Sequence, residues 1–237
     1  GKFDEQVDAL AQHVETSLKP LAEGIQSNAD SLDQIKDRIR AQQSQIVLLQ
    51  SELELVTRIV ALENRAQYQE YIDKGVEGHL AGDFESAAQQ FSKALAISPD
   101  SLRAFLNRGM AYQELGQWEN ALADFESAKK LDPENFAPWN NIAWLLATCP
   151  SDEVRSAEKA RAAALRACEL SQWKNYAAIS TLAAALAAGG EFKDALQRID
   201  EARKIAPETA LQSLDETSGL YEEGKPFQMN DPSKPEK

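Results

Sequence analysis

A 34-residue spacing runs through the middle of this chain and constrains its fold more than any other feature. Phe91 and Phe125 are 34 residues apart, and so are Gly75 and Gly109. A chain with a repeat of this length builds one small helical unit per repeat, and each unit buries its apolar face against the next. The sequence therefore predicts a stack of repeated units.

Four consecutive copies of the pattern can be aligned. Small residues recur at positions where two helices can approach closely, and large apolar residues stand beside them. Glycine can end the first helix of a copy with a positive φ, and proline cannot continue the second helix. Each copy is therefore predicted to be one helical hairpin. The copies are 68–101, 102–135, 136–175 and 176–209, and a helix over 209–223 is expected to cap the last one.

The aligned positions resemble the tetratricopeptide repeat family over 68–209. The shared features are glycine at the eighth position, proline near the end, and Gly-x-aromatic turns at 82–84, 116–118 and 190–192. The resemblance implies an all-α fold in which the hairpins stack into a right-handed superhelix with a concave inner surface. It also implies that the first helix of each hairpin lines a groove that binds a protein or peptide.

The third copy departs from the pattern because it carries about five extra residues after its first helix. Pro150 should end that helix near Cys149, and Ser151 or Asp152 can cap the next helix. The insert is then a longer loop at the hairpin tip. A passive spacer is favoured over a functional loop, because long surface insertions cost little.

A different pattern precedes the repeats, in residues 1–66. Apolar residues alternate three and four positions apart from Leu18 to Val60, which is typical of a coiled coil. Pro20 and Gly24 interrupt the pattern and predict a kink or a fresh helix start, with a hairpin that folds 1–19 back as the alternative. The residues expected to form the oligomerisation seam are Leu32, Ile35, Ile39, Gln42, Ile46, Leu49, Leu53 and Val56.

Self-association is the expected fate of this seam, because a single helix with an exposed apolar stripe is a poor monomer. Isoleucine in both core positions of the heptad favours a trimer over a dimer. Asn28 and Gln42 can fix the register of the strands, and antiparallel pairing stays open. The sequence thus predicts a homo-oligomer.

The resemblance places a set of polar and apolar side chains in the groove. Amide side chains can donate to and accept from the backbone of an extended peptide, while methionine and tryptophan supply apolar anchors. A structural spacer with an unused, solvated groove is the alternative. The candidate peptide-binding residues are Arg103, Asn107, Met110, Asn140, Asn141 and Trp144.

Some members of the family grip the C-terminal carboxylate of chaperones with a clamp of lysine, arginine and asparagine. This chain matches the clamp only at Asn107, since Ile72, Val76, Ala137 and Asn141 occupy its other positions. A buried carboxylate without cations costs several kcal/mol. A chaperone-tail adaptor is therefore disfavoured.

Composition excludes several classes of function. A net charge of −13 disfavours nucleic acid and anionic membranes as partners, and there is no apolar run of 18 residues to span a bilayer. Cys149 and Cys168 lack metal-ligand spacing, and an enzymatic function would need an acid/base pair such as Glu77 and His79. We expect no catalytic, metal or cofactor site, and hence no enzyme. Residues 224–237, rich in proline and charge, are predicted to be a disordered tail.

The compartment is open. No signal peptide is visible, but the chain starts at Gly1 and not at methionine, so a tag remnant at Gly1 and a removed export signal or anchor both stay open. Its order of parts is similar to bacterial periplasmic proteins that trimerise through an N-terminal coiled coil and coordinate cell division. That resemblance favours the periplasm or envelope, and a role as an envelope-assembly adaptor, with the cytoplasm as the alternative.

Overall fold

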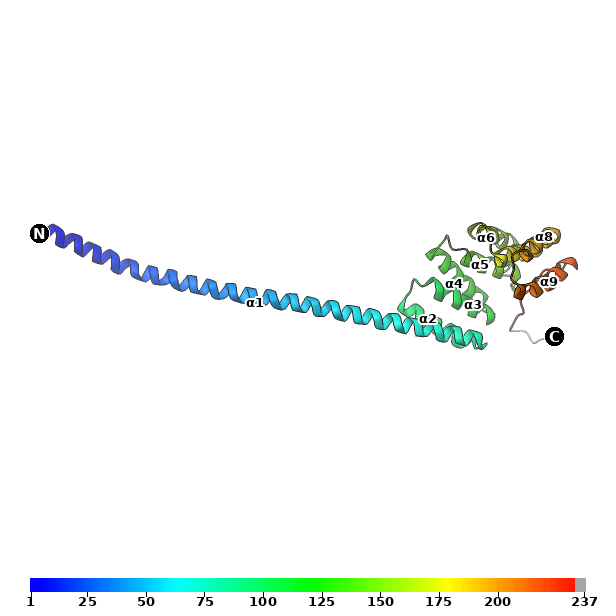
Figure 1. The fold of residues 1–237 in the computed structure, drawn as a ribbon, viewed down its shortest axis with the longest axis horizontal. Helices are drawn as coiled ribbons and strands as arrows, with labels where there is room; N and C mark the ends of the chain where they lie inside the picture. Colours follow the sequence, from blue (N-terminus) through cyan, green and yellow to red (C-terminus); the bar gives the residue numbers. More distant parts are fainter. Residues whose placement is uncertain (233–237) are drawn as a thin grey trace. The chain divides into compact units, whose positions relative to one another are not determined.

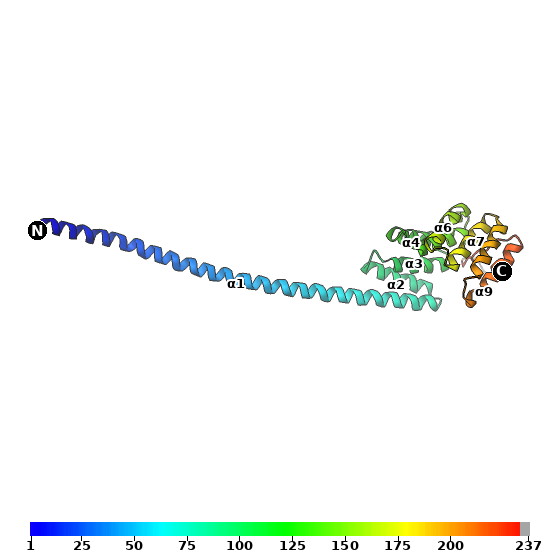
Figure 2. The same cartoon turned by 45° about the horizontal axis from the view of Figure 1, so that its top comes forward.

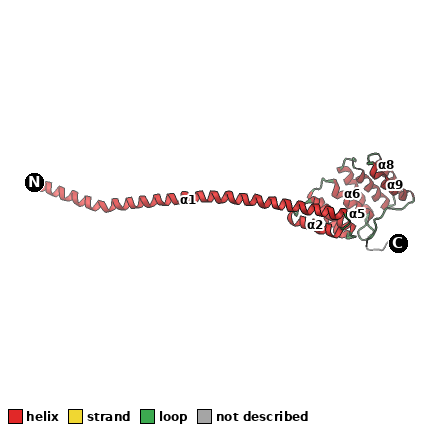
Figure 3. Ribbon diagram, turned by 60° about the horizontal axis from the view of Figure 1, so that its bottom comes forward, coloured by secondary structure: helices red, strands yellow, loops and turns green. Residues whose placement is uncertain are grey.

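Helices make up every regular element in residues 1–232, the part of the chain that the computed structural model describes (Figure 1). Loops and turns join them (Figure 3), and side chains are described in this range except at Lys2, Asp4 and Glu5. The predicted all-α class is confirmed, with hairpin-packed helices after a long N-terminal one. The helices are α1 (Lys2–Leu80), α2 (Phe84–Ile97), α3 (Leu102–Glu114), α4 (Trp118–Leu131), α5 (Phe136–Thr148), α6 (Ala157–Leu170), α7 (Tyr176–Ala188), α8 (Phe192–Arg203) and α9 (Glu208–Glu222).

The chain divides into two units, Gly1–Glu63 and Asn64–Lys237. The first unit contains the part of α1 up to Glu63, and this helix continues through Pro20 and Gly24. The predicted helix break and the alternative hairpin are therefore wrong for this structure. Pro20 cannot donate to the carbonyl of Thr16, but the helix is exposed there, so solvent can satisfy that one group.

The predicted seam residues lie along this helix without a partner in the single chain. Their apolar members are between 48% and 67% exposed. A second row of leucines follows the same seven-residue spacing outside the predicted seam: Leu48, Leu55 and Leu62 are 57% to 66% exposed. These leucines lie about 100° around the helix from the nearer seam positions, so they form a second apolar row separate from the seam.

The helices of Asn64–Lys237 follow one another in chain order from α2 to α9, and consecutive hairpins pack against each other (Figure 2). Turns end the first helices as predicted, with φ of 78° at Gly82, 70° at Gly116 and 80° at Gly190. At the start of α3 the side chain of Ser101 accepts from the Ala104 N–H at 3.1 Å. Local turn and cap chemistry thus sets the helix bounds.

Close contact within each hairpin depends on a small residue facing a large one. A Cβ added at Gly75 would lie 2.5 Å from Cε1 of Phe91, and one added at Gly109 would lie 2.5 Å from Cε1 of Phe125. Both rings are buried almost completely. The glycines therefore let the aromatic side chains of the second helices reach the backbone of the first.

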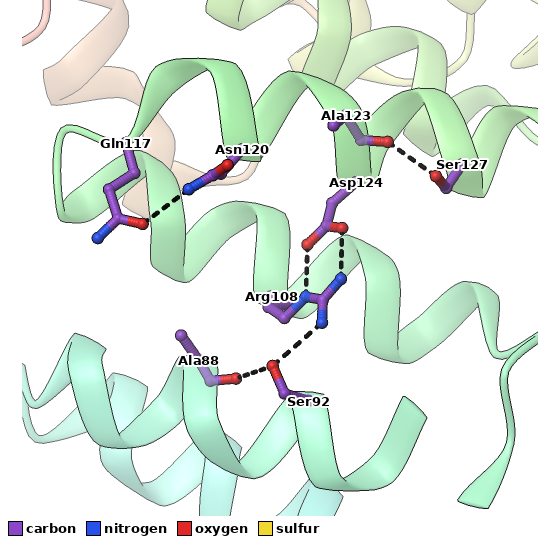
Figure 4. Close-up of polar contacts among 8 residues, drawn as sticks. All are labelled: Ala88, Ser92, Arg108, Gln117, Asn120, Ala123, Asp124 and Ser127. Carbon is purple, nitrogen blue, oxygen red and sulfur yellow. Dashed lines mark hydrogen bonds and ion pairs between the residues drawn. The ribbon is translucent and has the colours of Figure 1, made fainter. Parts of the chain in front are cut away.

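A polar link joins the first two hairpins (Figure 4). Arg108 of α3 donates from Nε and Nη2 to the two carboxylate oxygens of Asp124 in α4, both at 2.7 Å. Its Nη1 donates to Oγ of Ser92 in α2 at 3.0 Å. Asp124 is only 5% exposed. The hydrogen bonds from Arg108 to its carboxylate raise the pKa of Arg108. The link therefore fixes α2, α3 and α4 together.

The third copy caps its second helix differently from the prediction. Ser156, not Ser151 or Asp152, caps α6, because its side chain accepts from the Lys159 N–H while its own N–H donates to the carbonyl of Leu146 at 2.9 Å. Val154 is buried against the core cluster of this region. The extra residues thus form a packed turn, which supports the spacer interpretation.

Candidate functional site

A pocket of about 190 Å³ lies where two of the predicted groove residues meet. Asn107 and Met110 stand one turn apart on α3 and face the end of α1. The pocket is lined by Val76, His79, Leu80, Phe91, Asn107 and Met110, and we call it the Asn107 pocket. Its walls are mainly apolar, with one amide and one imidazole among them.

His79 gives the Asn107 pocket an unsatisfied hydrogen-bonding group. Its Nε2 atom is buried and has no hydrogen-bond partner among the described residues. The ring packs edge-on against Phe84, with 5.2 Å between centroids, so it is held in place. A buried polar atom without a partner is costly.

The other predicted groove residues are distributed around the first helices of the second and third copies. Arg103 is exposed near the start of α3 and does not line the Asn107 pocket. Asn140 and Asn141 are half-buried on α5, and Oδ1 of Asn140 is buried without a hydrogen-bond partner among the described residues. The structure therefore joins Asn107 with Met110 but does not gather all six candidates into one pocket.

Trp144, the last of the six, is covered by the C-terminal segment. Its ring lies 5.4 Å from the ring of Phe227, centroid to centroid, at an interplanar angle of 35°. The Met229 N–H donates to the carbonyl oxygen of Thr148 at 2.9 Å. The sequence predicted disorder from residue 224, whereas residues up to Pro232 make defined contacts; 233–237 lie outside the described residues.

A larger hollow of about 400 Å³ lies elsewhere, along α2 and the end of α3. It contains none of the predicted groove residues, and Glu85, Gln89 and Lys93 in its lining are exposed. Long, solvated side chains do not hold a ligand in one geometry. We therefore base the candidate site on the Asn107 pocket and on the surface around Trp144.

Reactive chemistry has little support in the described residues. Within residues 1–232 no group of three or more His, Cys, Asp and Glu side chains is placed to hold a metal ion, and no helix is long and apolar enough to cross a membrane. Cys149 and Cys168 are buried free thiols, and burial raises the pKa of both. A raised pKa removes the thiolate that a nucleophile or metal ligand needs.

Two family models match the repeats. Residues 102–135 match the model described as tetratricopeptide repeat, and residues 79–116 match the one described as TPR repeat. Both matches fall on the copies that contain the Asn107 pocket.

Curated proteins are similar to this chain over short segments only. Sperm-associated antigen 1 of Mus musculus is 39% identical over 62 residues, 26% of this chain and 7% of that protein. Small glutamine-rich tetratricopeptide repeat-containing protein 2 of Mycosarcoma maydis is 31% identical over 30% of this chain and 20% of its own length. Hsp70-Hsp90 organizing protein of Triticum aestivum is 38% identical over 26% of this chain and 10% of its own length. The chain thus spans a fifth or less of each.

Solved structures show the same fold over a longer part of the chain. Pseudomonas aeruginosa PilF superposes with a TM-score of 0.57 at 20% identity, covering 68% of this chain and 71% of that one. The MamA protein superposes with a TM-score of 0.52 at 20% identity, covering 67% of this chain and 82% of that one. The likeness to bacterial cell-division coordinators finds no support in these comparisons.

Proposed function

We propose that this chain, a tetratricopeptide-repeat protein with a long N-terminal helix, is a non-enzymatic scaffold that binds an extended peptide segment of a partner protein. Repeats of this kind mediate contacts between proteins. The observation that carries the proposal is the Asn107 pocket, a mainly apolar hollow in which the predicted groove residues Asn107 and Met110 line the same wall.

The side chains of the Asn107 pocket suit a neutral peptide. Asn107 can donate to a backbone carbonyl and accept from a backbone N–H of the same ligand residue. Val76 and Met110 offer apolar contact to that residue's side chain. Such a ligand gains affinity from main-chain hydrogen bonds and specificity from the apolar pocket.

A chaperone C-terminus is a poor candidate for this ligand. Ile72, at one of the clamp positions, is 0% exposed and part of the core. Val76, at another, forms an apolar wall of the Asn107 pocket. Because neither position offers a cation, the pocket cannot compensate a carboxylate. We therefore propose an internal peptide segment as the ligand, despite the similarity to an organizing protein of chaperones.

Oligomerisation through residues 1–63 is the second part of the proposal. The exposed seam would be covered by other copies of α1, and isoleucine in both core positions of the heptad favours three strands over two. Three chains would present three grooves to one partner. Linked sites raise the overall affinity for a partner with repeated motifs.

Selection from a displayed library of random peptides on the intact chain tests this function. Selected peptides should bind Asn107→Ala at least about tenfold more weakly, which corresponds to the loss of a buried hydrogen bond worth about 1.4 kcal/mol. Asn120→Ala is the matched control, because Asn120 is exposed and its side chain donates to the neighbouring Gln117. If no peptide is enriched, or if both variants bind alike, the chain is better described as a spacer or tether.

A further inference from the structure

The chain reverses direction after the last helix and returns over the repeats. Gly224 has a φ of 69°, its N–H donates to the carbonyl of Tyr221 at 3.0 Å, and the Lys225 N–H donates to that of Leu220 at 2.9 Å. These bonds form a left-handed helix end that glycine adopts without strain. The following residues, 225–231, have no helix or turn. We call residues 225–232 the tail segment.

Burial alternates along the tail segment. Phe227, Met229 and Asp231 are half-buried, whereas Gln228 and Asn230 between them are exposed. A period of two is the signature of an extended strand that lays one face on a surface. The segment therefore lies on the repeats in the way that an extended peptide ligand lies in a groove.

Its contacts involve both side chains and main chain. Phe227 packs on Trp144, and Met229 packs against the same core cluster. The carbonyl that accepts from the Met229 N–H belongs to Thr148, the last residue of α5, where a helix leaves its carbonyls without internal partners. Trp144 and Thr148 are one turn apart on α5, so one strip of that helix meets two residues of the tail segment.

The tail segment reaches the second hairpin as well. A Cβ added at Gly116 would lie 2.9 Å from Cγ of Pro232. Gln113, one turn beyond Met110 on α3, lines a hollow of about 280 Å³ with Phe227, Met229 and Pro232. The tail segment therefore lies on the predicted groove residue Trp144 and beside the helix that carries Asn107 and Met110.

We propose that the tail segment is a tethered stand-in for the ligand, and that the external ligand of the Trp144 surface is an extended peptide with two large apolar residues, one position apart, that displaces it. The inference rests on the proposed function and specifies its ligand. The pattern of the segment, Phe227-Gln228-Met229, defines the class: an aromatic residue, any residue, then a flexible apolar one.

The contacts are of a size that permits exchange. Phe227 and Met229, the two apolar side chains of the segment that pack on the repeats, are only half-buried, and the Met229 N–H makes a single main-chain hydrogen bond to Thr148. A short tether gives the segment an effective concentration on the order of millimolar at the surface. An external peptide must compete with that concentration. Its apparent affinity is therefore its intrinsic affinity multiplied by the fraction of chains whose surface is free of the tail segment.

The direct test uses a synthetic peptide of residues 225–232 with both ends blocked, added to full-length protein. It should bind the Phe227→Ala/Met229→Ala chain at least about tenfold more tightly than the intact chain, whose own segment occupies the surface. The same peptide with its phenylalanine changed to alanine should lose this binding, and the one with Gln228→Ala should keep it. A chain that ends at Gly224 should behave like the double variant, provided that its thermal unfolding remains cooperative.

Equal binding of the peptide to the intact chain and to the double variant would overturn the inference, as would binding that ignores the phenylalanine. Peptides selected from a random library separate this failure from a failure of the proposed function. If selected peptides bind the intact chain and the double variant alike, only the competition is wrong. If none is selected on either protein, the proposed function itself is wrong.

Discussion

Phe125 of α4 occupies the space that a side chain at Gly109 of α3 would need, with only 2.5 Å between its Cε1 atom and an added Cβ. Gly75 and Phe91 repeat this pairing one hairpin earlier at the same distance. In the fourth hairpin Ala183 stands at the glycine position and Ile199 at the aromatic position, and both are buried. The size of the side chain on the second helix of a hairpin thus limits the size of the side chain that fits opposite it on the first helix.

Gly109→Ala should therefore destabilise the protein, although alanine is the better helix former. Overpacking of a tight core contact costs about 1–3 kcal/mol. Gly219→Ala is the matched control, since nothing lies within 4 Å of a Cβ added there in α9. That variant should gain about 0.5–1 kcal/mol from the intrinsic preference alone. Urea unfolding of the two variants measures both, and equal effects would contradict the packing argument.

Phe125→Ile should rescue Gly109→Ala, because the fourth hairpin already combines alanine with isoleucine. The double variant should be more stable than the sum of the two single changes predicts, by about 0.5–3 kcal/mol. A double-mutant cycle with an interaction energy near zero would show that the two positions are independent.

Asp124→Ala should cost far more than removal of an exposed ion-pair partner. It leaves the guanidinium of Arg108, whose side chain is 20% exposed, without its carboxylate. An unpaired charge in such a place costs about 2–4 kcal/mol in the free energy of unfolding. Glu134→Ala is the control, because the Glu134 side chain is 77% exposed in its pair with Arg166 and should matter by about 0–1 kcal/mol.

Replacing both partners of this ion pair tests its contribution to stability in a second way. Arg108→Met together with Asp124→Leu removes the charge and its partner at once, and should recover most of the loss. A loss as large as that of Asp124→Ala alone would mean that the hydrogen bond to Ser92, and not the ion pair, stabilises this junction.

The free energy of unfolding should fall as the pH rises in the alkaline range, because the Cys168 thiol is buried. Burial raises the pKa of this thiol from its ordinary 9.0 to about 12 in the folded protein. Between these values the unfolded chain releases a proton that the folded chain keeps, so unfolding becomes more favourable as pH rises. One such thiol contributes a slope of up to about 1.4 kcal/mol per pH unit. Urea unfolding from pH 8 to 10.5 should show a shallower slope for Cys168→Ala, and parallel slopes would contradict this assignment.

Repetition made the hairpins predictable from sequence. Gly82 and Gly116 recur at one position of the 34-residue period, and both adopt the positive φ that their turns require. Arg108 and Asp124 have no such signal, since the first copy has Lys74 and Gln90 at the same positions. A contact present in one copy alone cannot be recognised from a period.

The candidate site was predictable only in part. Asn107 and Met110 are three residues apart on one helix, and that spacing places them on one face, where they line the same pocket. The tail segment was missed because its proline and charge are typical of disorder, and its contact with Trp144 spans 83 positions of sequence without any repeat. The alternation of Phe227 and Met229 with polar residues was the only available signal.

The proposed assembly of the chain through α1 would turn one groove into several. The double variant Ile39→Asp/Ile46→Asp places charge in the seam, whereas Ser44→Asp, on the opposite face of the heptad, leaves the seam intact. Buried charge without a partner should dissociate the strands, and a solvated one should not.

Light scattering of the intact chain, next to these two variants, is the measurement that tests the account most directly. It should give three times the 26.1 kDa chain mass for the intact chain and for Ser44→Asp, and a single chain mass for the double variant. A mass of two chains would keep the scaffold and change its number of grooves. A mass of 26.1 kDa for the intact chain would contradict the claim that α1 joins the chains.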